Sequence, residues 1–355
     1  MTDARPGTRA VNERHRFDEA ALVRWMGGHV RGFEGPATLR QFEGGQSNPT
    51  FLVEAVSGDY VLRKRPPGAL LATAHQVDRE FRILGALADS GVPVPRVHAC
   101  CSEAGVIGTA FYVMDYQPGR IFTDPLLPGV PAADRAAIYD SMNATLARLH
   151  GVDWRALGLV DFGRPEGYLA RQLALWSRQY AAARTGETPT LDALRDWLEA
   201  QPVPADAAAI VHGDFRVGNL IVHEHEPRVV AVLDWELATL GHPLADLAYN
   251  CMTYHLPAGH AVAAGFLGAD LAALGVPRQE EYMATYARRT GLDAIPDWRF
   301  FMAFSLFRVA AIQLGVYARA LQGNAASPVA RLFGDSHRMV AAAGWAVARG
   351  AAVGA

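Results

Sequence analysis

The segment from His212 to Asn219, together with Asp234 downstream, limits the folds open to this chain more than any other feature. Short apolar runs flank both parts and fit brief buried strands, at 210–211, 220–222 and 229–233. Folding the second run onto the third around the polar stretch 223–228 would bring Asn219 near Asp234. An Asp, an Asn five residues on and a second Asp after the next strand pair form the arrangement that phosphoryl transfer needs. We therefore expect Asp214 to accept a hydroxyl proton, and Asn219 and Asp234 to hold Mg²⁺ against the phosphates of ATP.

Taken singly, these acids also suit structural roles, since Asp214 could close a turn and Asp234 could be a loop residue. The N-terminal half favours a site, because it contains a candidate loop for phosphates between two extended segments. Its members are Gly44, Gly45, Ser47 and Asn48. Glycine lets the backbone approach an anion and present N–H groups, and the serine adds a hydroxyl donor. On its own this loop also fits a plain hairpin turn.

A β-hairpin over residues 51–64 should deliver a cation next to that loop. It ends in Arg63 and Lys64, whose side chains point to opposite faces of the strand, so only one of them can reach the nucleotide. Lys64 is the only lysine in the chain. From the residues alone, both remain candidates.

A helix over residues 75–90 carries Glu80 inside its apolar stripe. A buried acid requires a cation, and a basic residue from the preceding strand is the natural partner. Such a pair would fix the cation for the phosphates, although a purely structural ion pair is the alternative.

An apolar strand over residues 111–116 then runs into a Pro-Gly break and suits a connector between two lobes. Backbone groups near its end could bind adenine whatever their side chains are, and Met114 could form the pocket wall. The residues expected at the nucleotide here are Met114, Asp115, Tyr116 and Gln117.

These motifs resemble the aminoglycoside phosphotransferase and choline kinase-like superfamily over residues 39–324. The chain looks like the branch related to the N-terminal kinase-like regions of acyl-CoA dehydrogenase family members ten and eleven. Matching stretches are 43–48, 61–68, 78–80, 212–219, 233–236 and 243–248. The resemblance implies an α+β, protein kinase-like fold with a small antiparallel β N-lobe carrying one helix and a larger, mainly helical C-lobe. It places the lobes at residues 1–115 and 116–355.

The resemblance also implies residue roles. Arg63 becomes the phosphate-contacting cation with Glu80 as its helix partner, and Asp214 becomes the catalytic base. Asp246 resembles the buried acid that braces the catalytic loop. Two departures stand out: Gly241-His242-Pro243 replaces the usual Gly-Asp-Pro, and Arg63 replaces a lysine. Arg is a planar fork and Lys a point charge, so nucleotide geometry should differ from that of drug-modifying relatives.

The acceptor is expected on two helices of the C-lobe. Candidate residues are Tyr168, Gln172, Trp176, Arg308 and Arg319. Gln172 and Trp176 share one helix face, a pattern that recurs in this branch. If the arginines face the cleft, they suit an anionic acceptor such as a carboxylate or a CoA phosphate; otherwise they are surface residues.

Composition excludes several function classes. The net charge of −3 indicates no nucleic-acid partner, and the short, Arg-interrupted apolar stretch 339–348 indicates no membrane span. Three cysteines without metal-ligand spacing predict reduced thiols and a cytoplasmic location. Residues 1–16 are polar and read as a flexible lead-in rather than a secretory signal.

The sequence thus predicts a small-molecule kinase that uses ATP and Mg²⁺. A hydroxyacyl-CoA or hydroxy acid is the leading acceptor, and an aminoglycoside or a choline-like amino alcohol is the alternative. A nucleotide-binding regulator without transfer activity is the alternative from another class. A protein kinase is disfavoured because few residues separate Asp234 from Pro243.

Overall fold

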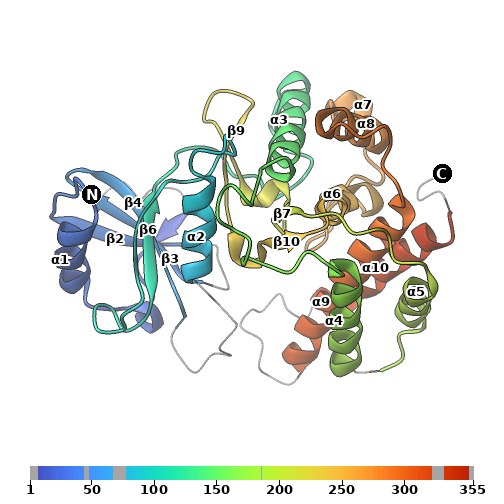
Figure 1. Cartoon of the computed structure of the whole chain (residues 1–355), viewed down its shortest axis with the longest axis horizontal. Helices are drawn as coiled ribbons and strands as arrows, with labels where there is room; N and C mark the ends of the chain where they lie inside the picture. Colours follow the sequence, from blue (N-terminus) through green and yellow to red (C-terminus); the bar gives the residue numbers. More distant parts are fainter. Residues whose placement is uncertain (1–6, 44–47, 67–76, 185, 322–331, 352–355) are drawn as a thin grey trace. The chain divides into compact units, whose positions relative to one another are not determined.

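The computed structural model describes residues 7–43, 48–66, 77–184, 186–321 and 332–351 (Figure 1). The chain divides into two compact units. The first holds Met1–Gly119 and Val230–Ala238, and the second holds Arg120–Val229 and Thr239–Ala355.

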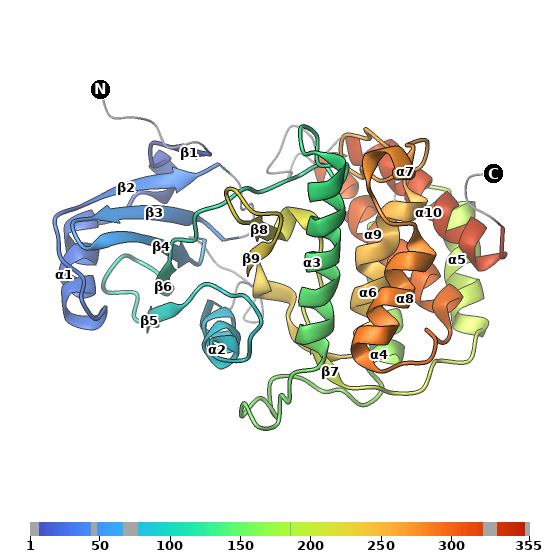
Figure 2. The same ribbon diagram turned by 90° about the horizontal axis from the view of Figure 1, so that it is seen from above.

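The first unit is built on a six-stranded antiparallel sheet in the order β1-β2-β3-β4-β6-β5. Its strands are β1 (Thr8–Arg9), β2 (Ala37–Phe42), β3 (Thr50–Ala55), β4 (Gly58–Lys64), β5 (Val97–Cys101) and β6 (Phe111–Asp115). The predicted hairpin is β3 and β4, with Thr50 opposite Arg63. Its helices are α1 (Glu19–His29) and α2 (Val77–Leu87), seen beside the sheet in Figure 2.

Helix α1 is an addition to the expected lobe with one helix. Asp18 caps it by accepting a hydrogen bond from the Ala21 N–H. Leu22 and Met26, one turn apart, pack with Phe51 and Leu62 in the core on one face of the sheet. Because strand side chains alternate, Arg63 faces the opposite side, toward α2.

The flexible lead-in expected over residues 1–16 is wrong for residues 7–16. Thr8 and Arg9 pair with Gln41 and Phe42 of β2, and a short 3-10 helix, η1 (Glu13–His15), follows. This polar stretch carries no apolar periodicity, and long-range contacts order it: the Asn12 N–H donates to Gln41 Oε1 at 3.0 Å, Arg40 Nε donates to the Thr8 hydroxyl at 2.8 Å, and Val11 packs against the core.

The single boundary expected between residues 115 and 116 also needs correction. Residues 116–119 and the segment 230–238 belong to the first unit. This later segment contains most of β9 (Val229–Val232) and the 3-10 helix η3 (Trp235–Leu237). The Val232 N–H donates to the Pro93 carbonyl at 2.9 Å, and Arg79 of α2 donates to the Ala238 carbonyl at 3.2 Å. These long-range contacts carry Asp234 to α2.

The second unit is mainly helical. Its helices are α3 (Ala132–His150), α4 (Tyr168–Ala183), α5 (Pro189–Ala200), α6 (Pro243–Cys251), α7 (Leu271–Leu274), α8 (Gln279–Thr290), α9 (Trp298–Leu321) and α10 (Phe333–Ala348), with 3-10 helices η2 (Val217–Asn219) and η4 (Met252–His255). Its strands are β7 (Ala209–Val211), β8 (Leu220–Val222) and β10 (Thr239–Gly241). The predicted turn after β8 is closed by the His223 N–H donating to the Arg228 carbonyl at 2.9 Å.

Helix α9 is the central helix of this unit and contacts α4, α5, α6 and α10 (Figure 2). By length and composition alone it could cross a membrane, with a mean hydropathy of 1.6 over its most apolar window. However, 67% of that window is buried inside the protein, as in the core helix of a globular domain. The apolar stretch 339–348 lies in α10.

Candidate active site

In the first unit, the Arg63 guanidinium holds the candidate phosphate-binding residues together. Arg63 Nε lies 2.8 Å from Glu80 Oε2, and its NH2 lies 2.7 Å from Asp234 Oδ1. Glu236 Oε2 lies 3.9 Å from the same NH2. Two edges of one planar guanidinium therefore hold two carboxylates, which a lysine could not do with the same geometry. Although burial opposes the charged form, Glu80 and Asp234 raise the pKa of Arg63.

Glu80 is the buried member of this cluster. Burial raises the pKa of Glu80 to about 7, despite the opposing effect of the Arg63 guanidinium. Asn48 Nδ2 donates to Glu80 Oε1 at 2.9 Å, and the Tyr112 hydroxyl donates to Oε2 at 3.1 Å. Asn48, which was expected at the phosphates, is fully buried and supports Glu80, and its contact with a nucleotide stays a prediction. Gly44, Gly45 and Ser47 lie outside the described residues.

The choice between the two basic residues of β4 follows from strand alternation. Lys64 Nζ lies 4.9 Å from the Phe17 ring centroid, on the face opposite Arg63, and burial lowers the pKa of Lys64. The residue is 3% exposed. The geometry thus favours Arg63 over Lys64 for phosphate contact, because Arg63 alone points toward Glu80 and Asp234.

Asp234 has an unusual backbone. Its φ of 66° and ψ of 64° place it in the left-handed region, at the start of η3. A non-glycine residue there costs of order 1 kcal/mol and is held by its surroundings, often at functional sites. Its side chain is 35% exposed.

The connector residues occupy the end of β6. Met114 is buried opposite Val61 and Val97. This position is consistent both with the expected pocket wall and with a role in the core. His98 Nε2 lies 2.6 Å from Asp115 Oδ1. The Asp115 N–H donates to the Arg96 carbonyl at 2.8 Å, and the Tyr116 N–H donates to the Asp59 carbonyl at 3.3 Å.

The N–H groups of Asp115 and Tyr116 thus already donate to backbone carbonyls. Gln117 is half-buried, and adenine binding by this segment stays a prediction.

In the second unit, a tight loop after β7 presents Asp214. Gly213 has a φ of 83°, a conformation in which glycine avoids the strain of a side chain. Asp246 of α6 accepts hydrogen bonds from the His212 N–H and from the Gly213 N–H, the latter at 2.8 Å. His150 Nε2 lies 3.5 Å from the same carboxylate.

Burial works against ionisation of Asp246, but the hydrogen bond and charge of His150, with His212, lower the pKa of Asp246. The brace expected for this acid is therefore present in the geometry.

Three side chains hold the Asp214 carboxylate. Asn219 Nδ2 donates to Oδ2 at 2.7 Å and to the Asp214 backbone carbonyl at 2.8 Å. The Tyr249 hydroxyl of α6 donates to Oδ1, and Arg216 Nε lies 3.3 Å from the same oxygen. Burial and the nearby Asp214 raise the pKa of Tyr249, so its hydroxyl remains a donor near neutral pH.

Tyr249 and Arg216 are functional candidates that the sequence analysis missed. Tyr249 follows Asp246 by three residues, so helical spacing alone could have placed it on the same face of α6. Arg216 lies two residues after Asp214 and offered no comparable signal.

The expected acceptor residues separate into two groups. Arg308 NH2 donates to the Gly213 carbonyl at 2.8 Å. Its guanidinium carbon lies 5.5 Å from the Trp176 ring centroid and 5.2 Å from that of Tyr249. Gln172 Oε1 accepts from the Trp176 indole at 3.2 Å. Arg308 thus supports the backbone of the loop that presents Asp214, and Trp176 packs against Arg308; their expected contact with an acceptor stays a prediction.

The other two candidates lie elsewhere. Tyr168 is 7% exposed, and a Cβ on Gly241 would come within 2.8 Å of its ring, so it packs inside the unit. Burial raises the pKa of Tyr168 to about 12. Arg319 is exposed near the end of α9. It lies eleven residues from Arg308, which is about 16 Å along a helix.

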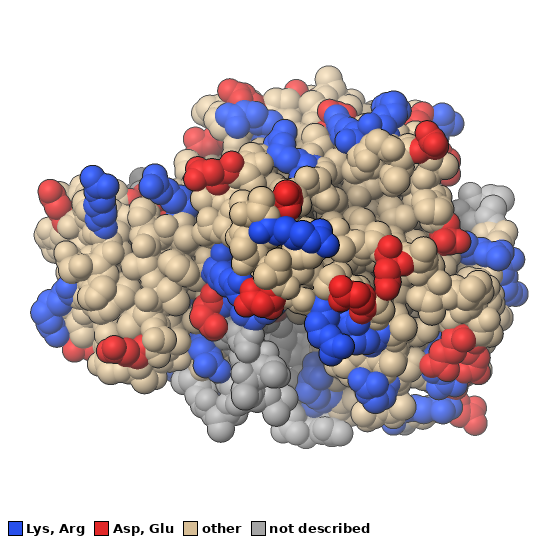
Figure 3. Space-filling model, in the orientation of Figure 1, with Lys and Arg blue, Asp and Glu red and all other residues tan. Residues whose placement is uncertain are grey.

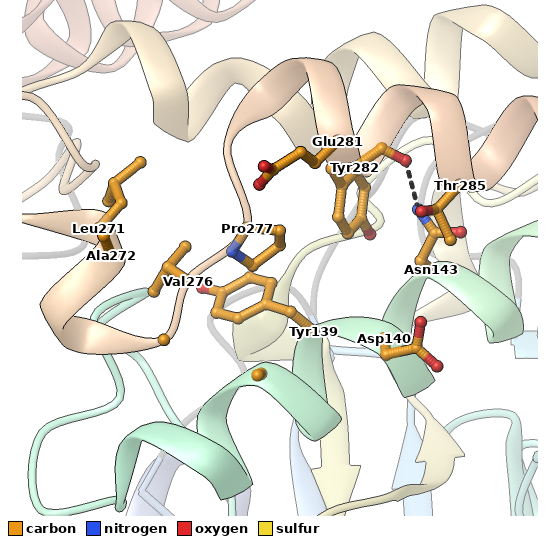
Figure 4. A pocket seen from close by; sticks show the side chains of 12 residues that line it. Tyr139, Asp140, Asn143, Leu271, Ala272, Val276, Pro277, Glu281, Tyr282 and Thr285 are labelled. Atoms are coloured by element: carbon orange, nitrogen blue, oxygen red, sulfur yellow. Dashed lines mark hydrogen bonds between the residues drawn. The ribbon is translucent and has the colours of Figure 1, made fainter.

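A cavity of about 320 Å³ lies between α3, α7 and α8 (Figure 4). Its polar side chains already have protein partners. Arg289 pairs with Asp140 at 2.8 Å, Asn143 Nδ2 donates to the Tyr282 carbonyl at 2.9 Å, and Arg278 pairs with Glu281 at 2.8 Å. This cavity contacts neither Asp214 nor its hydrogen-bond partners.

A second cavity, of about 350 Å³, adjoins the loop of residues 212–219 that presents Asp214, and it was not expected from sequence. We call it the loop cavity. Its walls come from this loop, from α3, α6, η4 and α9, and from the segments around Thr123 and His260. Tyr249 and Arg216, the two side chains that contact Asp214 as donors, line it. No Asp or Glu of the described residues lines it.

The described ranges contain no group of three or more His, Cys, Asp or Glu side chains arranged to hold a metal. Mg²⁺ in phosphoryl transfer takes only one or two carboxylates together with phosphates and water. Asn219 donates through Nδ2, which leaves Oδ1 as its possible metal-binding atom. Arg63 pairs with Oδ1 of Asp234, so Oδ2 is the possible metal-binding atom of that carboxylate. Asn219 in the second unit and Asp234 in the first unit each offer an oxygen ligand of the type that Mg²⁺ binds.

Charge is mixed on the face shown in Figure 3, where basic side chains lie among Asp and Glu side chains. Among the coloured residues, no large region of one sign dominates that face.

A model of the phosphotransferase enzyme family matches residues 38–292. The chain belongs to this family. Acyl-CoA dehydrogenase family member 10 of Mus musculus is 45% identical over 341 residues, covering 96% of this chain and 32% of that protein. Member 11 of Rattus norvegicus is 42% identical over 354 residues, covering 98% of this chain and 45% of that protein. The chain thus spans less than half the length of either relative.

Among solved structures, a Ralstonia eutropha protein provisionally described as an aminoglycoside phosphotransferase is 45% identical. Its TM-score is 0.86, with 95% of this chain and 99% of that chain covered. A spectinomycin phosphotransferase bound to ADP and spectinomycin has a TM-score of 0.60 at 13% identity, covering 92% of this chain and 98% of that one. That likeness concerns the fold alone. The family and the kinase-like fold predicted from the sequence are confirmed.

Proposed function

We propose that this phosphotransferase-family chain is a kinase that transfers the γ-phosphoryl group of ATP, with Mg²⁺, to a hydroxyl of a small molecule. The observation that carries the proposal is the Asp214 carboxylate, held by Asn219 and Tyr249 beside the loop cavity. A positioned carboxylate next to a cavity of small-molecule size is what general-base catalysis on a hydroxyl requires.

The first unit supports nucleotide binding. Arg63 is fixed by Glu80 and Asp234, so a phosphate oxygen would meet a cation that is already oriented. Family membership and the ADP bound to the spectinomycin phosphotransferase favour ATP as the phosphoryl donor.

In the proposed reaction, the acceptor oxygen forms a bond to the γ-phosphorus as the bond to the β–γ bridging oxygen breaks. The hydroxyl proton passes to Asp214, and ADP leaves with the bridging oxygen. Asn219 and Tyr249 fix the carboxylate so that one lone pair can meet the hydroxyl, while Arg308 fixes the loop backbone through Gly213. When bound, Mg²⁺ would supply charge neutralisation of the phosphates, with Asn219 and Asp234 as its proposed protein ligands.

The side chains that line the loop cavity indicate which type of acceptor it would bind. It carries a guanidinium, from Arg216, and no described carboxylate. A polycationic aminoglycoside or a choline-like amino alcohol would find no counter-charge among these lining residues, whereas a carboxylate or phosphate would find Arg216. We therefore propose a hydroxyacyl-CoA or a hydroxy acid as the acceptor.

A panel assay tests this choice. ADP release would be measured with ATP and Mg²⁺ against hydroxyacyl-CoAs, free hydroxy acids, choline-like alcohols and aminoglycosides. We expect release only with the first two classes. Release confined to aminoglycosides or choline would contradict the proposed acceptor. ATP binding with no release across the panel would favour a silent nucleotide-binding regulator instead.

A further inference from the structure

We propose that the loop cavity binds the alkyl chain of the acceptor and thereby selects hydroxy acids or hydroxyacyl groups with a chain of several carbons over their short homologues. This inference rests on the proposed function, because it assigns the loop cavity to the acceptor. It adds which part of the acceptor the cavity recognises, namely an aliphatic part.

Most polar side chains in the wall of the loop cavity already have protein partners. Asn250 donates to the Phe215 carbonyl at 3.3 Å and accepts from the Tyr282 hydroxyl at 2.7 Å. Further lining side chains also bond to protein atoms, namely Tyr139, Tyr249, Thr253 and His260. The Gln313 amide oxygen has no partner among the described residues, but it is itself shielded from solvent and adds no polar surface that a ligand can reach. The wall therefore offers a ligand few polar groups.

The rest of the wall is mainly aliphatic and comes from several elements. Val309 of α9 lines the cavity, as do Val262 and Ala264 of the segment that follows η4. These three residues are half-buried, so part of their apolar surface is not covered by protein. More deeply buried lining residues are Met142, Met252 and Leu256. Removing apolar surface from water favours binding about fourfold for each fully buried methylene group, so an alkyl chain suits this wall.

The charge of Arg216 indicates where the polar end of such a molecule lies. Half of its side chain is exposed, and its Nε lies 3.3 Å from Asp214 Oδ1. A carboxylate or thioester carbonyl that pairs with Arg216 would lie close to the proposed base, as phosphorylation of a nearby hydroxyl requires.

The volume of the loop cavity sets the length of the chain. Its 350 Å³ corresponds to about a dozen groups of the size of a water molecule, at roughly 30 Å³ each. This volume suits a short or medium chain together with its polar end.

The test compares 3-hydroxybutanoate, 3-hydroxyhexanoate and 3-hydroxyoctanoate. Binding is measured by calorimetry on the 355-residue chain with Mg²⁺ and a non-hydrolysable ATP analogue. Because each acid has two methylene groups more than the one before it, the wild-type protein should bind it about five- to fifteenfold more tightly.

Two substitutions fill the cavity from different walls. Val309→Phe and Ala264→Leu each place additional carbons where the chain would lie, so each variant should bind the three acids within about threefold of one another. Thermal unfolding verifies that both variants are folded. Val160→Phe is the matched control, because Val160 is 62% exposed and does not line the cavity. It should keep the full gain in affinity with chain length.

Equal binding of the three acids by the wild type, or no binding of any, would overturn the proposal. A gain with chain length that persists in both folded cavity variants would overturn it as well. Phosphorylation is measured separately with ATP. A gain in binding without phosphorylation would support the chain site and contradict the kinase assignment, whereas phosphorylation of all three acids with equal kcat/KM would support the kinase assignment and contradict the chain site.

Discussion

Replacing Arg63 by Met should destabilise the first unit in a way that depends on pH. The side chains of Arg63 and Glu80 are 11% and 2% exposed, so the substitution leaves a carboxylate buried without its cation. Breaking such a buried pair costs about 3–5 kcal/mol. The hydrogen bonds from Asn48 and Tyr112 to Glu80 remain in the variant and reduce this destabilisation.

The sign of the pH dependence follows from Glu80. Its pKa in the folded protein is raised from 4.5 to about 7, so the folded state binds the extra proton and stability falls as pH rises between those values. Without Arg63, Glu80 should keep its proton to still higher pH. The stability deficit of Arg63→Met should therefore grow above pH 7 by up to about 1.4 kcal/mol per pH unit.

Urea titrations at pH 7 and pH 8.5, followed by pulsed hydrogen exchange of peptides from β4 and α2, would measure this deficit for the first unit alone. Adding Glu80→Gln to Arg63→Met removes the uncompensated charge, so the double variant should recover about 2 kcal/mol at pH 8.5 and lose the pH dependence. A deficit of Arg63→Met that is the same at both pH values, or a double variant no more stable than Arg63→Met, would refute this reasoning.

Three further outcomes follow from the same contacts. Tyr249→Phe removes the donor to Asp214 and should lower kcat about tenfold with little change in KM for ATP. The control Tyr254→Phe removes a hydroxyl that donates to the Pro277 carbonyl, and it should leave kcat unchanged. Equal kcat values for the two variants would contradict the role of Tyr249. Lys64→Met should leave ATP affinity by calorimetry within twofold of wild type, because Lys64 lies on the opposite face of β4 from Arg63; a tenfold loss would reverse the assignment. Gly213→Ala places a side chain at a φ of 83° and should cost about 1–2 kcal/mol in thermal unfolding and most of the activity, and a fully active, equally stable variant would contradict the loop argument.

Local patterns predicted the parts of the site that depend on them. Glu80 stood out as an acid within an apolar helix stripe, and strand alternation indicated that only one of Arg63 and Lys64 could face it. The fixed spacing from Asp214 to Asn219 described a loop whose hydrogen bonds the structure contains. These inferences succeed because each depends on residues a few positions apart.

Non-local packing explains what the sequence could not supply. The segment 230–238 joins the first unit through contacts with residues about 140 to 160 positions earlier, which no periodicity encodes. Periodicity placed Trp176 on a helix face but could not show that this face meets Arg308. The loop cavity likewise becomes visible only when η4 and α9 are brought together.

The central claim is tested most directly by comparing wild type with Asp214→Asn. Acceptor phosphorylation from γ-labelled ATP and ATP binding by calorimetry would be measured on both, with the exposed Asp206→Asn as the matched control. The account predicts that Asp214→Asn lowers phosphorylation by a factor of about 10² to 10⁴ while ATP affinity stays within about threefold, and that Asp206→Asn matches wild type. Equal phosphorylation rates for Asp214→Asn and wild type would contradict the account.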